Sequence, residues 1–431
     1  MFTTGLGSGS RVANSFVLEN AFKKRSEGTK KDKRRRIRND DPSSESYLGP
    51  WGGFEEDKRK TRKLEVNNAM REGQIAASEA AVGVADDMAE ALNAQERATS
   101  TFHGKDRHNW LSVPPKMSGK FSTDTINCQM PRRLIHTWKG HTGGVQCMKF
   151  FPKSGHLLLS CSLDSRIKIW DTLLDRECRM TYTGHSQGVR DVSFTRDGSK
   201  FYSAAFDTMV HLWDTETGKI ITSFSNNKIP FCVSVHPRDD DSIIVGNQVC
   251  KAIQYDAKSG KVVQEYNEHL GAVNSVTFCQ DGNKLVTTSE DRKIFVWTYG
   301  IPVVEKYIAE PHFHSVPAVT VHPTQPYLVG QSMNNSIIVY QTTDAFVYQS
   351  KKRFFGHSNT GYAIRPGFSP DGKFLTSGSS DGSVFFWDWK SAKMYRSFKA
   401  HDGVCMGSVW QPQTSSRMAT CGWDGLIKLW E

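Results

Sequence analysis

The strongest constraint on the fold is a short pattern that recurs along the chain. In five places an Asp stands six residues before a Trp, as in Leu163 to Trp170 and, at the end of the chain, Cys421 to Trp430. If Tyr255 and Tyr340 are counted where a Trp is due, seven aromatic positions follow one another at spacings of 42 to 47 residues. A repeat of fixed length decides the architecture before any local pattern does.

The period and its turns predict an all-β fold. A His precedes each of the five Trp residues by about 30 positions, and hairpin turns such as Asp197-Gly198 and Asp371-Gly372 follow the first apolar run of a unit. A period of this length matches one four-stranded blade. We predict a seven-bladed WD-repeat β-propeller over residues 132–431. An irregular, partly helical basic N-terminal arm over residues 1–131 precedes it.

The last repeat lacks a fourth strand, because the chain ends just after Trp430. The alternating stretch from Arg133 to Trp138 lies immediately before the first repeat. We expect it to supply the outer strand of the seventh blade, since a closed ring exposes no free sheet edges.

Four residue types recur together in five blades: a His, a Ser or Thr, an Asp and the Trp. A Ser, a His and an Asp also make a catalytic triad. Five copies of a nucleophile are implausible, so we interpret the sets as buried hydrogen-bonded networks that tie blade strands together. Blades three and five have Val249 and Asn334 instead of the Asp, which we attribute to repeat drift rather than to support from neighbouring blades or from partners. The five sets are His141, Ser160, Asp164, Trp170; His185, Ser203, Asp207, Trp213; His269, Thr287, Asp291, Trp297; His357, Ser377, Asp381, Trp387; and His401, Thr420, Asp424, Trp430.

Charge points to acidic partners. The net charge is +10 and the pI is about 9.0, which favours nucleic acid among other polyanions. No apolar run has the roughly 20 residues of a membrane helix, and Met1 to Ser10 does not resemble a secretory signal. The densest basic run is a candidate for nuclear import or RNA-backbone contact, with a merely solvated charge run as the alternative. Its residues are Lys30, Lys31, Lys33, Arg34, Arg35 and Arg36.

Two further stretches are candidates for partner binding. The first is a polar segment in which Tyr47, Leu48, Pro50 and Trp51 could anchor in pockets of a partner, or could pack against the chain's own propeller. The alanine-rich stretch after it, within residues 55–98, is expected to be helical.

The second is a rim of the ring, where the residue before each blade's Asp would lie. In blades seven, one and two, which adjoin once the ring closes, these residues are Trp423, Leu163 and Phe206. Three large apolar side chains in adjacent loops suggest an exposed interaction patch. Inward packing of each over its own blade is an equal alternative.

Several segments are more specific than a generic repeat. On these the sequence resembles the pre-mRNA-processing factor 17 family of WD-repeat proteins, along nearly all of residues 133–431 and in patches of the arm. They include Tyr47 to Trp51, Ile135 to Trp138, Phe151 to Ser162, Trp213 to Gly218, His269 to Asn274, Tyr307 to Pro311 and Cys421 to Trp430.

The resemblance implies a non-enzymatic nuclear scaffold of the spliceosome that acts around the second transesterification step, when the 3′ splice site docks and exons are ligated. It implies spliceosomal proteins and small nuclear ribonucleoproteins as partners, with direct RNA contact through the basic run as an option. It implies no cofactor, metal, membrane or small-molecule substrate. Two other classes stay open. One is a substrate receptor of a ubiquitin ligase or a chromatin-associated adaptor, and the other is a hydrolase on a propeller scaffold.

Overall fold

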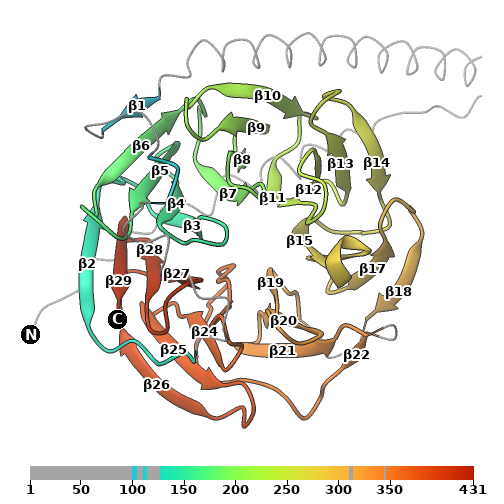
Figure 1. Cartoon of the computed structure of the whole chain (residues 1–431). Coiled ribbons are helices and arrows are strands. Elements are labelled where there is room, and N and C mark those ends of the chain that lie inside the picture. Colours follow the sequence, from blue (N-terminus) through green and yellow to red (C-terminus); the bar gives the residue numbers. More distant parts are fainter. Residues whose placement is uncertain (1–99, 104–109, 114–126, 310–313, 344–345) are drawn as a thin grey trace, which may run out of the picture. The chain divides into compact units, whose positions relative to one another are not determined.

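The computed structural model describes residues 100–103, 110–113, 127–309, 314–343 and 346–431. In this part of the chain the strands form seven sheets arranged as blades around one central axis (Figure 1). The predicted all-β, seven-bladed propeller is therefore confirmed. The basic run Lys30 to Arg36, the segment Tyr47 to Trp51 and the expected helix within 55–98 lie outside the described residues.

Each blade is a four-stranded antiparallel sheet whose first strand lies nearest the axis. Blade one contains β3 (Val145–Phe150), β4 (Leu157–Ser162), β5 (Arg166–Asp171) and β6 (Cys178–Thr183). Blade two contains β7 (Val189–Phe194), β8 (Lys200–Ala205), β9 (Met209–Asp214) and β10 (Ile220–Ser225). Blade three contains β11 (Pro230–Val235), β12 (Ser242–Asn247), β13 (Ala252–Asp256) and β14 (Val262–Tyr266).

The other blades repeat this order. Blade four contains β15 (Val273–Cys279), the 3₁₀ turn η1 (Gln280–Gly282), β16 (Lys284–Ser289), β17 (Ile294–Thr298) and β18 (Val304–Ile308). Blade five contains β19 (Ala318–Val321), β20 (Tyr327–Ser332), β21 (Ser336–Gln341) and β22 (Val347–Tyr348). Blade six contains β23 (Gly367–Phe368), β24 (Phe374–Gly378), β25 (Ser383–Asp388) and β26 (Met394–Lys399). Blade seven contains β27 (Cys405–Trp410), β28 (Met418–Gly422), β29 (Leu426–Trp430) and β2 (Leu134–Lys139).

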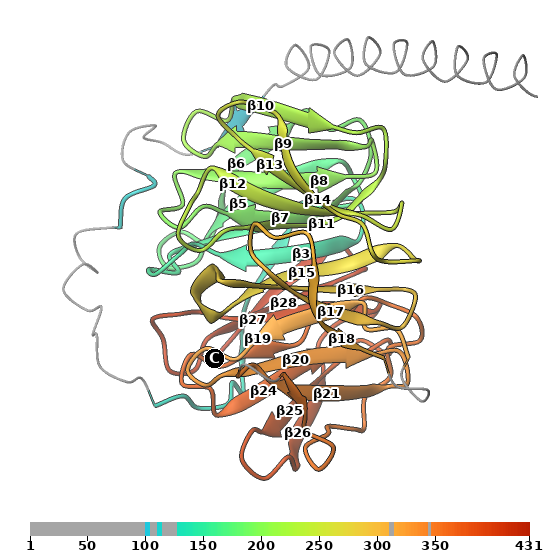
Figure 2. The same cartoon turned by 90° about the vertical axis from the view of Figure 1, so that its right-hand side faces the viewer.

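The middle strands of a blade are buried on both faces, because each sheet packs between two neighbouring sheets (Figure 2). All six residues of β4 are buried, whereas five of the six residues of β26, an outer strand, are exposed. This explains why strict alternation of apolar and polar residues is weak in the middle strands and why short apolar runs mark them. No helix in the described residues is long and apolar enough to cross a membrane.

The ring closes where β2 joins the last blade. β2 pairs antiparallel with β29, with Leu134 opposite Trp430 and Trp138 opposite Ile427. Trp138 is only 2% exposed, and its indole nitrogen donates a hydrogen bond to the carbonyl of Arg176 at 2.8 Å. The expectation that the stretch from Arg133 to Trp138 supplies the outer strand of blade seven is therefore confirmed.

Residues before position 132 also join the ring. The short strand β1 (Thr101–Phe102) pairs with β6 and adds a fifth strand to blade one. The backbone N–H of Cys128 donates to the carboxylate of Asp371 at 2.9 Å, and the Cys128 side chain is buried. Part of the stretch that the sequence assigns to the arm thus packs against the propeller.

The turn between the second and third strands has the same backbone in all seven blades. The residue after each Asp, or after the residue that replaces it, has a positive φ between 52° and 84°. Only two of these seven residues are glycine. They are Ser165, Thr208, Cys250, Arg292, Asn335, Gly382 and Gly425.

Candidate interaction surface at the mouth of the channel

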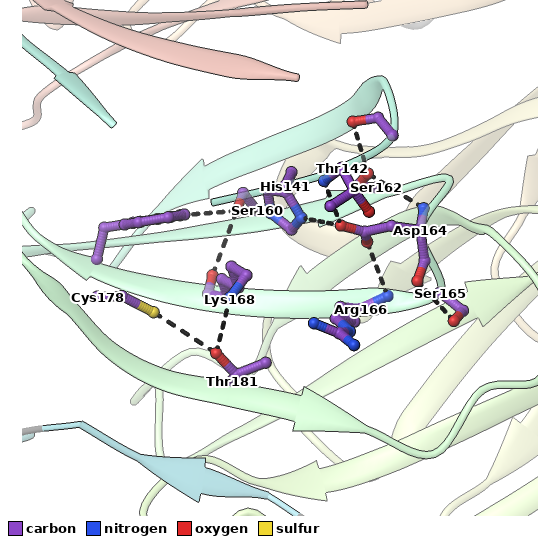
Figure 3. A network of polar contacts seen from close by, with 12 residues as sticks. His141, Thr142, Ser160, Ser162, Asp164, Ser165, Arg166, Lys168, Cys178 and Thr181 are labelled. Atoms are coloured by element: carbon purple, nitrogen blue, oxygen red, sulfur yellow. Dashed lines mark hydrogen bonds and ion pairs between the residues drawn. The ribbon is translucent and has the colours of Figure 1, made fainter. Parts of the chain in front are cut away.

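Four of the five predicted residue sets form one hydrogen-bonded chain each, as Figure 3 shows around His141 in blade one. The Trp indole N–H donates to the hydroxyl of the Ser or Thr at 2.8 to 2.9 Å. This hydroxyl lies 2.7 to 2.9 Å from Nε2 of the His. The Nδ1 atom of the His lies 2.8 to 3.1 Å from the Asp carboxylate. In blades one, two, four and seven the chain therefore links the loop before the first strand, the second strand, the turn that follows it and the third strand.

The carboxylates of these chains are held in their ionised form. Burial works against ionisation of Asp164, Asp207, Asp291 and Asp424, but the hydrogen bond and charge of the adjacent His, together with backbone N–H donors, keep each pKa below its ordinary value. Each side chain is at most about an eighth exposed. The sets are thus internal braces of the blades.

One group of possible metal ligands occurs in the described residues: His185, Asp207 and His211, whose ligand atoms lie within 4.8 Å of one another. His211 stacks on His185 with 4.3 Å between ring centroids. His185 is already hydrogen-bonded to the carboxylate of Asp207 through Nδ1 and to the hydroxyl of Ser203 through Nε2. A metal ion would have to break the brace of blade two, so the group fits a structural role better.

Blade six does not form the predicted set, and this prediction is wrong. Nε2 of His357 meets the side-chain amide of Gln331 in blade five, at 2.8 and 2.9 Å, instead of Ser377. The indole of Trp387 donates to the carbonyl of Phe355 at 3.0 Å. Asp381 accepts hydrogen bonds from the backbone and the hydroxyl of Ser383. A polar side chain from the neighbouring blade thus replaces the bond within the blade.

The three predicted rim residues do not all share one surface. Leu163 and Trp423 are 38% and 41% exposed, and Phe206 is partly buried. Phe206 and Trp423 line the same pocket, whereas Leu163 is absent from its lining and packs close to the backbone of Gly188. The patch of three neighbours is therefore better described as a pair at the pocket with Leu163 outside it.

The pocket has a volume of about 270 Å³ and lies on the axis of the ring, because all seven blades contribute to its lining. Six of the blades each contribute one residue at or near the start of the innermost strand. These residues are Gln146, Arg190, Phe231, Asn274, Pro317 and Met406. Blade six contributes the segment from Gly361 to Arg365, which precedes its shortened first strand. The pocket is thus the mouth of the central channel.

Two guanidinium groups meet at this mouth. Arg365 lies 2.8 Å from the buried carboxylate of Asp191 and also donates to the sulfur of Cys147 at 3.2 Å. Arg190 stacks over the ring of Phe231 at 3.8 Å and faces Phe206 at 5.8 Å. A T-shaped contact between Tyr362 and Trp423, with centroids 4.9 Å apart, forms another part of the wall.

Sequence reasoning missed Arg190, Phe231, Tyr362 and Arg365. The first two stand one residue after the start of an innermost strand, a position that the closed ring brings to the axis. A count of equivalent positions across blades would have found them. Tyr362 and Arg365 belong to the longest repeat, in which 47 residues separate Tyr340 from Trp387, so the unusual spacing was the available signal.

Comparison with known proteins agrees with this architecture. The WD40 family, described as "WD domain, G-beta repeat", matches residues 132–171, 176–214, 260–298, 348–388 and 392–431. Pre-mRNA-processing factor 17 of Mus musculus is 40% identical over 407 residues, which cover 93% of this chain and 70% of the relative. The Homo sapiens protein of that name matches equally well. The Saccharomyces cerevisiae protein is 32% identical over 95% of this chain and 90% of its own length. The resemblance found in the sequence is therefore confirmed, and the chain belongs to the pre-mRNA-processing factor 17 family.

Proposed function

We propose that this protein is a non-enzymatic scaffold of the spliceosome in the nucleus. We further propose that it acts around the second transesterification step, when the 3′ splice site docks and exons are ligated. The observation that carries the proposal is the similarity to pre-mRNA-processing factor 17, which extends over 93% of the chain and so beyond the propeller alone. A generic repeat protein would match only within its blades.

The physical properties of the ring suit a scaffold. Its His, Ser or Thr and Asp sets are buried braces, so the residues that look most like catalytic groups are occupied in holding the blades. A closed ring offers a stiff platform, and several weak contacts on one platform add through effective concentration. Catalysis would then belong to other components of the assembly.

The partners in this proposal are spliceosomal proteins and small nuclear ribonucleoproteins. The basic run Lys30 to Arg36 would serve nuclear import, with RNA-backbone contact as its second role. Tyr47, Leu48, Pro50 and Trp51 would anchor in a protein partner. Phe206 and Trp423 would make contacts at the channel mouth, because large apolar side chains at a pocket are typical contact residues.

The test is a splicing reaction in nuclear extract depleted of the endogenous protein and supplied with the tagged full chain. We expect the depleted extract to accumulate lariat intermediate and the full chain to restore exon ligation. The double variant Phe206→Ala with Trp423→Ala should restore it less, at unchanged thermal stability. Leu163→Ala, which alters an exposed residue outside the pocket, is the matched control.

The same tag identifies the assembly. Sequencing of the co-purifying RNA should recover U2, U5 and U6 small nuclear RNAs with lariat intermediate. Recovery of ubiquitin-ligase subunits or histones without these RNAs would overturn the proposal and favour the adaptor alternative. A block before the first step, with no lariat intermediate, would reject the second-step assignment while leaving a role in splicing.

A further inference from the structure

The two guanidinium groups at the channel mouth differ in one respect. Arg365 is neutralised, because its Nη2 atom lies 2.8 Å from Asp191, a carboxylate whose side chain is 3% exposed. The same carboxylate also accepts a hydrogen bond from the backbone of Val233 at 3.1 Å. This ion pair spans the channel from the segment before blade six to the innermost strand of blade two. It is complete without a ligand.

Arg190 has no such partner. It forms no ion pair with any carboxylate in the part of the chain that the structure describes, and its planar group lies over Phe231 at 3.8 Å. Burial lowers the pKa of Arg190, and repulsion from Arg365 acts in the same direction. Asp191 and Glu290 attract it more weakly. A stacked guanidinium keeps its N–H edges free for acceptors in its plane, where a carboxylate fits in a bidentate arrangement.

Several apolar side chains line the pocket together with Arg190. The guanidinium of Arg190 lies 3.8 Å from the ring centroid of Phe231 and 5.8 Å from that of Phe206. The pocket lining also includes Trp423, which is 41% exposed and whose ring centroid lies 4.9 Å from that of Tyr362. Pro317, Met333 and Met406 complete the apolar lining. A volume of about 270 Å³ is sufficient for a few side chains of a peptide and too small for a folded domain.

From this arrangement we infer that the channel mouth binds an extended acidic peptide segment of a partner protein. An Asp or Glu side chain of this peptide pairs with Arg190, and flanking apolar side chains rest on Trp423 and Phe206. The inference deepens the proposed function, on which it relies only for the expectation that the peptide belongs to the splicing assembly.

Charge favours a peptide over RNA at this place. RNA binding draws on several Lys and Arg contacts to successive phosphates. The pocket offers one unpaired cation, and the exposed carboxylate of Glu290 in the same lining would repel a second phosphate. One carboxylate beside apolar groups matches this single cation.

The experiment is selection of a random 12-residue peptide library displayed on phage against the immobilised full chain. A parallel selection uses Arg190→Gln. We expect the wild-type chain to enrich peptides with Asp or Glu next to aromatic or aliphatic residues, and Arg190→Gln to lose this enrichment. Arg396→Gln is the matched control, because Arg396 is exposed and also lies over a Phe ring, at 5.7 Å, on the outer strand of blade six.

A selected peptide is then measured by fluorescence anisotropy. Changing its Asp to Asn should weaken binding about tenfold or more, since the change replaces a charge-assisted hydrogen bond with a neutral one. The difference in affinity between the Asp and Asn peptides should vanish when they bind the Arg190→Gln variant. It should be partly restored with the Arg190→Lys variant. The thermal unfolding midpoint of each variant should equal that of the wild-type chain.

Three outcomes of the peptide assays would overturn the inference, and a fourth would reassign the occupant. In the first, the wild-type chain enriches peptides that contain no acidic residue. In the second, the Arg190→Gln variant still enriches acidic peptides. In the third, single-stranded RNA displaces the selected peptide and acidic peptides do not. If a synthetic peptide of residues 40–51 binds more tightly than every selected peptide, the occupant is this chain's own segment and not a partner. All these assays contain no spliceosome, so their failure leaves the proposed function standing, and failure of the splicing assay leaves the peptide result unaffected.

Discussion

Thr208 occupies a backbone conformation that β-branched residues avoid. Its φ is 67°, and it follows Asp207 in the turn between the second and third strands of blade two. The left-handed region costs a residue with a Cβ atom about 1 to 2 kcal/mol, and a glycine there has no such cost. Gly425, with a φ of 73°, occupies the same place in blade seven.

We expect Thr208→Gly to raise the free energy of unfolding by about 0.5 to 1 kcal/mol, because relief of strain exceeds the entropy that glycine adds to the unfolded chain. The reverse change, Gly425→Ala, should lower it by more than about 1 kcal/mol, since a Cβ atom would lie 3.0 Å from the carbonyl oxygen of His141. Urea unfolding followed by tryptophan fluorescence measures both. A destabilised Thr208→Gly would show that the Thr side chain contributes more by its contacts than the turn loses by strain.

His357 should make stability depend on pH. Burial lowers its pKa from 6.5 to about 4, and its Nδ1 atom is buried with no hydrogen-bond partner among the described residues. The unfolded chain therefore binds a proton at this residue below pH 6.5, while the folded chain does so only near pH 4. Stability is fully present above pH 6.5 and is lost as the pH falls through this window.

The variant His357→Gln cannot titrate there. We expect the free energy of unfolding of the wild-type chain, relative to this variant, to fall by about 3 kcal/mol between pH 7 and pH 4. Urea unfolding of both proteins at matched pH values gives the difference, in which the contributions of the other carboxyl and imidazole groups cancel. A difference that stays constant across the window would mean that the pKa of His357 is the same in the folded and the unfolded chain.

At the scale of the element, a blade can be predicted from the sequence because its parts are close in the chain. In four blades the His, the hydroxyl residue, the Asp and the Trp belong to the same repeat, which gives both their identity and their partners. The closing strand β2 was also predictable, since the last repeat is one strand short. Local periodicity carries this information.

What could not be predicted depends on contacts between blades. His357 bonds to Gln331 of blade five, and nothing within its own repeat signals that choice. The segment before β23 leaves only two residues in the first strand of blade six, and Arg365 from it reaches Asp191 across the channel. The pocket likewise exists only after seven blades have met around one axis. These features depend on contacts between residues of different blades, and the repeat pattern does not specify those contacts.

At the scale of the whole molecule, a strand from the beginning of the propeller completes its last blade. β2 supplies the outer edge of blade seven, and the backbone of Arg133 exchanges hydrogen bonds with Glu431 at 2.7 and 2.8 Å. Trp138 is buried beside Trp170, with 6.2 Å between ring centroids, so it links the seventh blade to the first. Loss of a buried Trp side chain alone costs about 3 to 5 kcal/mol.

We therefore expect deletion of residues 132–138 to open the ring. The deletion removes the buried Trp138 and leaves β29 as a free sheet edge, so the variant should melt at a lower temperature and self-associate through this edge. A synthetic peptide of residues 131–140, added in excess, should restore part of the lost stability by pairing with β29. The same peptide with Trp138→Ala should restore less, and a scrambled peptide should restore nothing. Differential scanning calorimetry and light scattering follow both effects. A deletion variant that melts at the temperature of the full chain and remains monomeric would show that the propeller is held closed by contacts between its first strands alone.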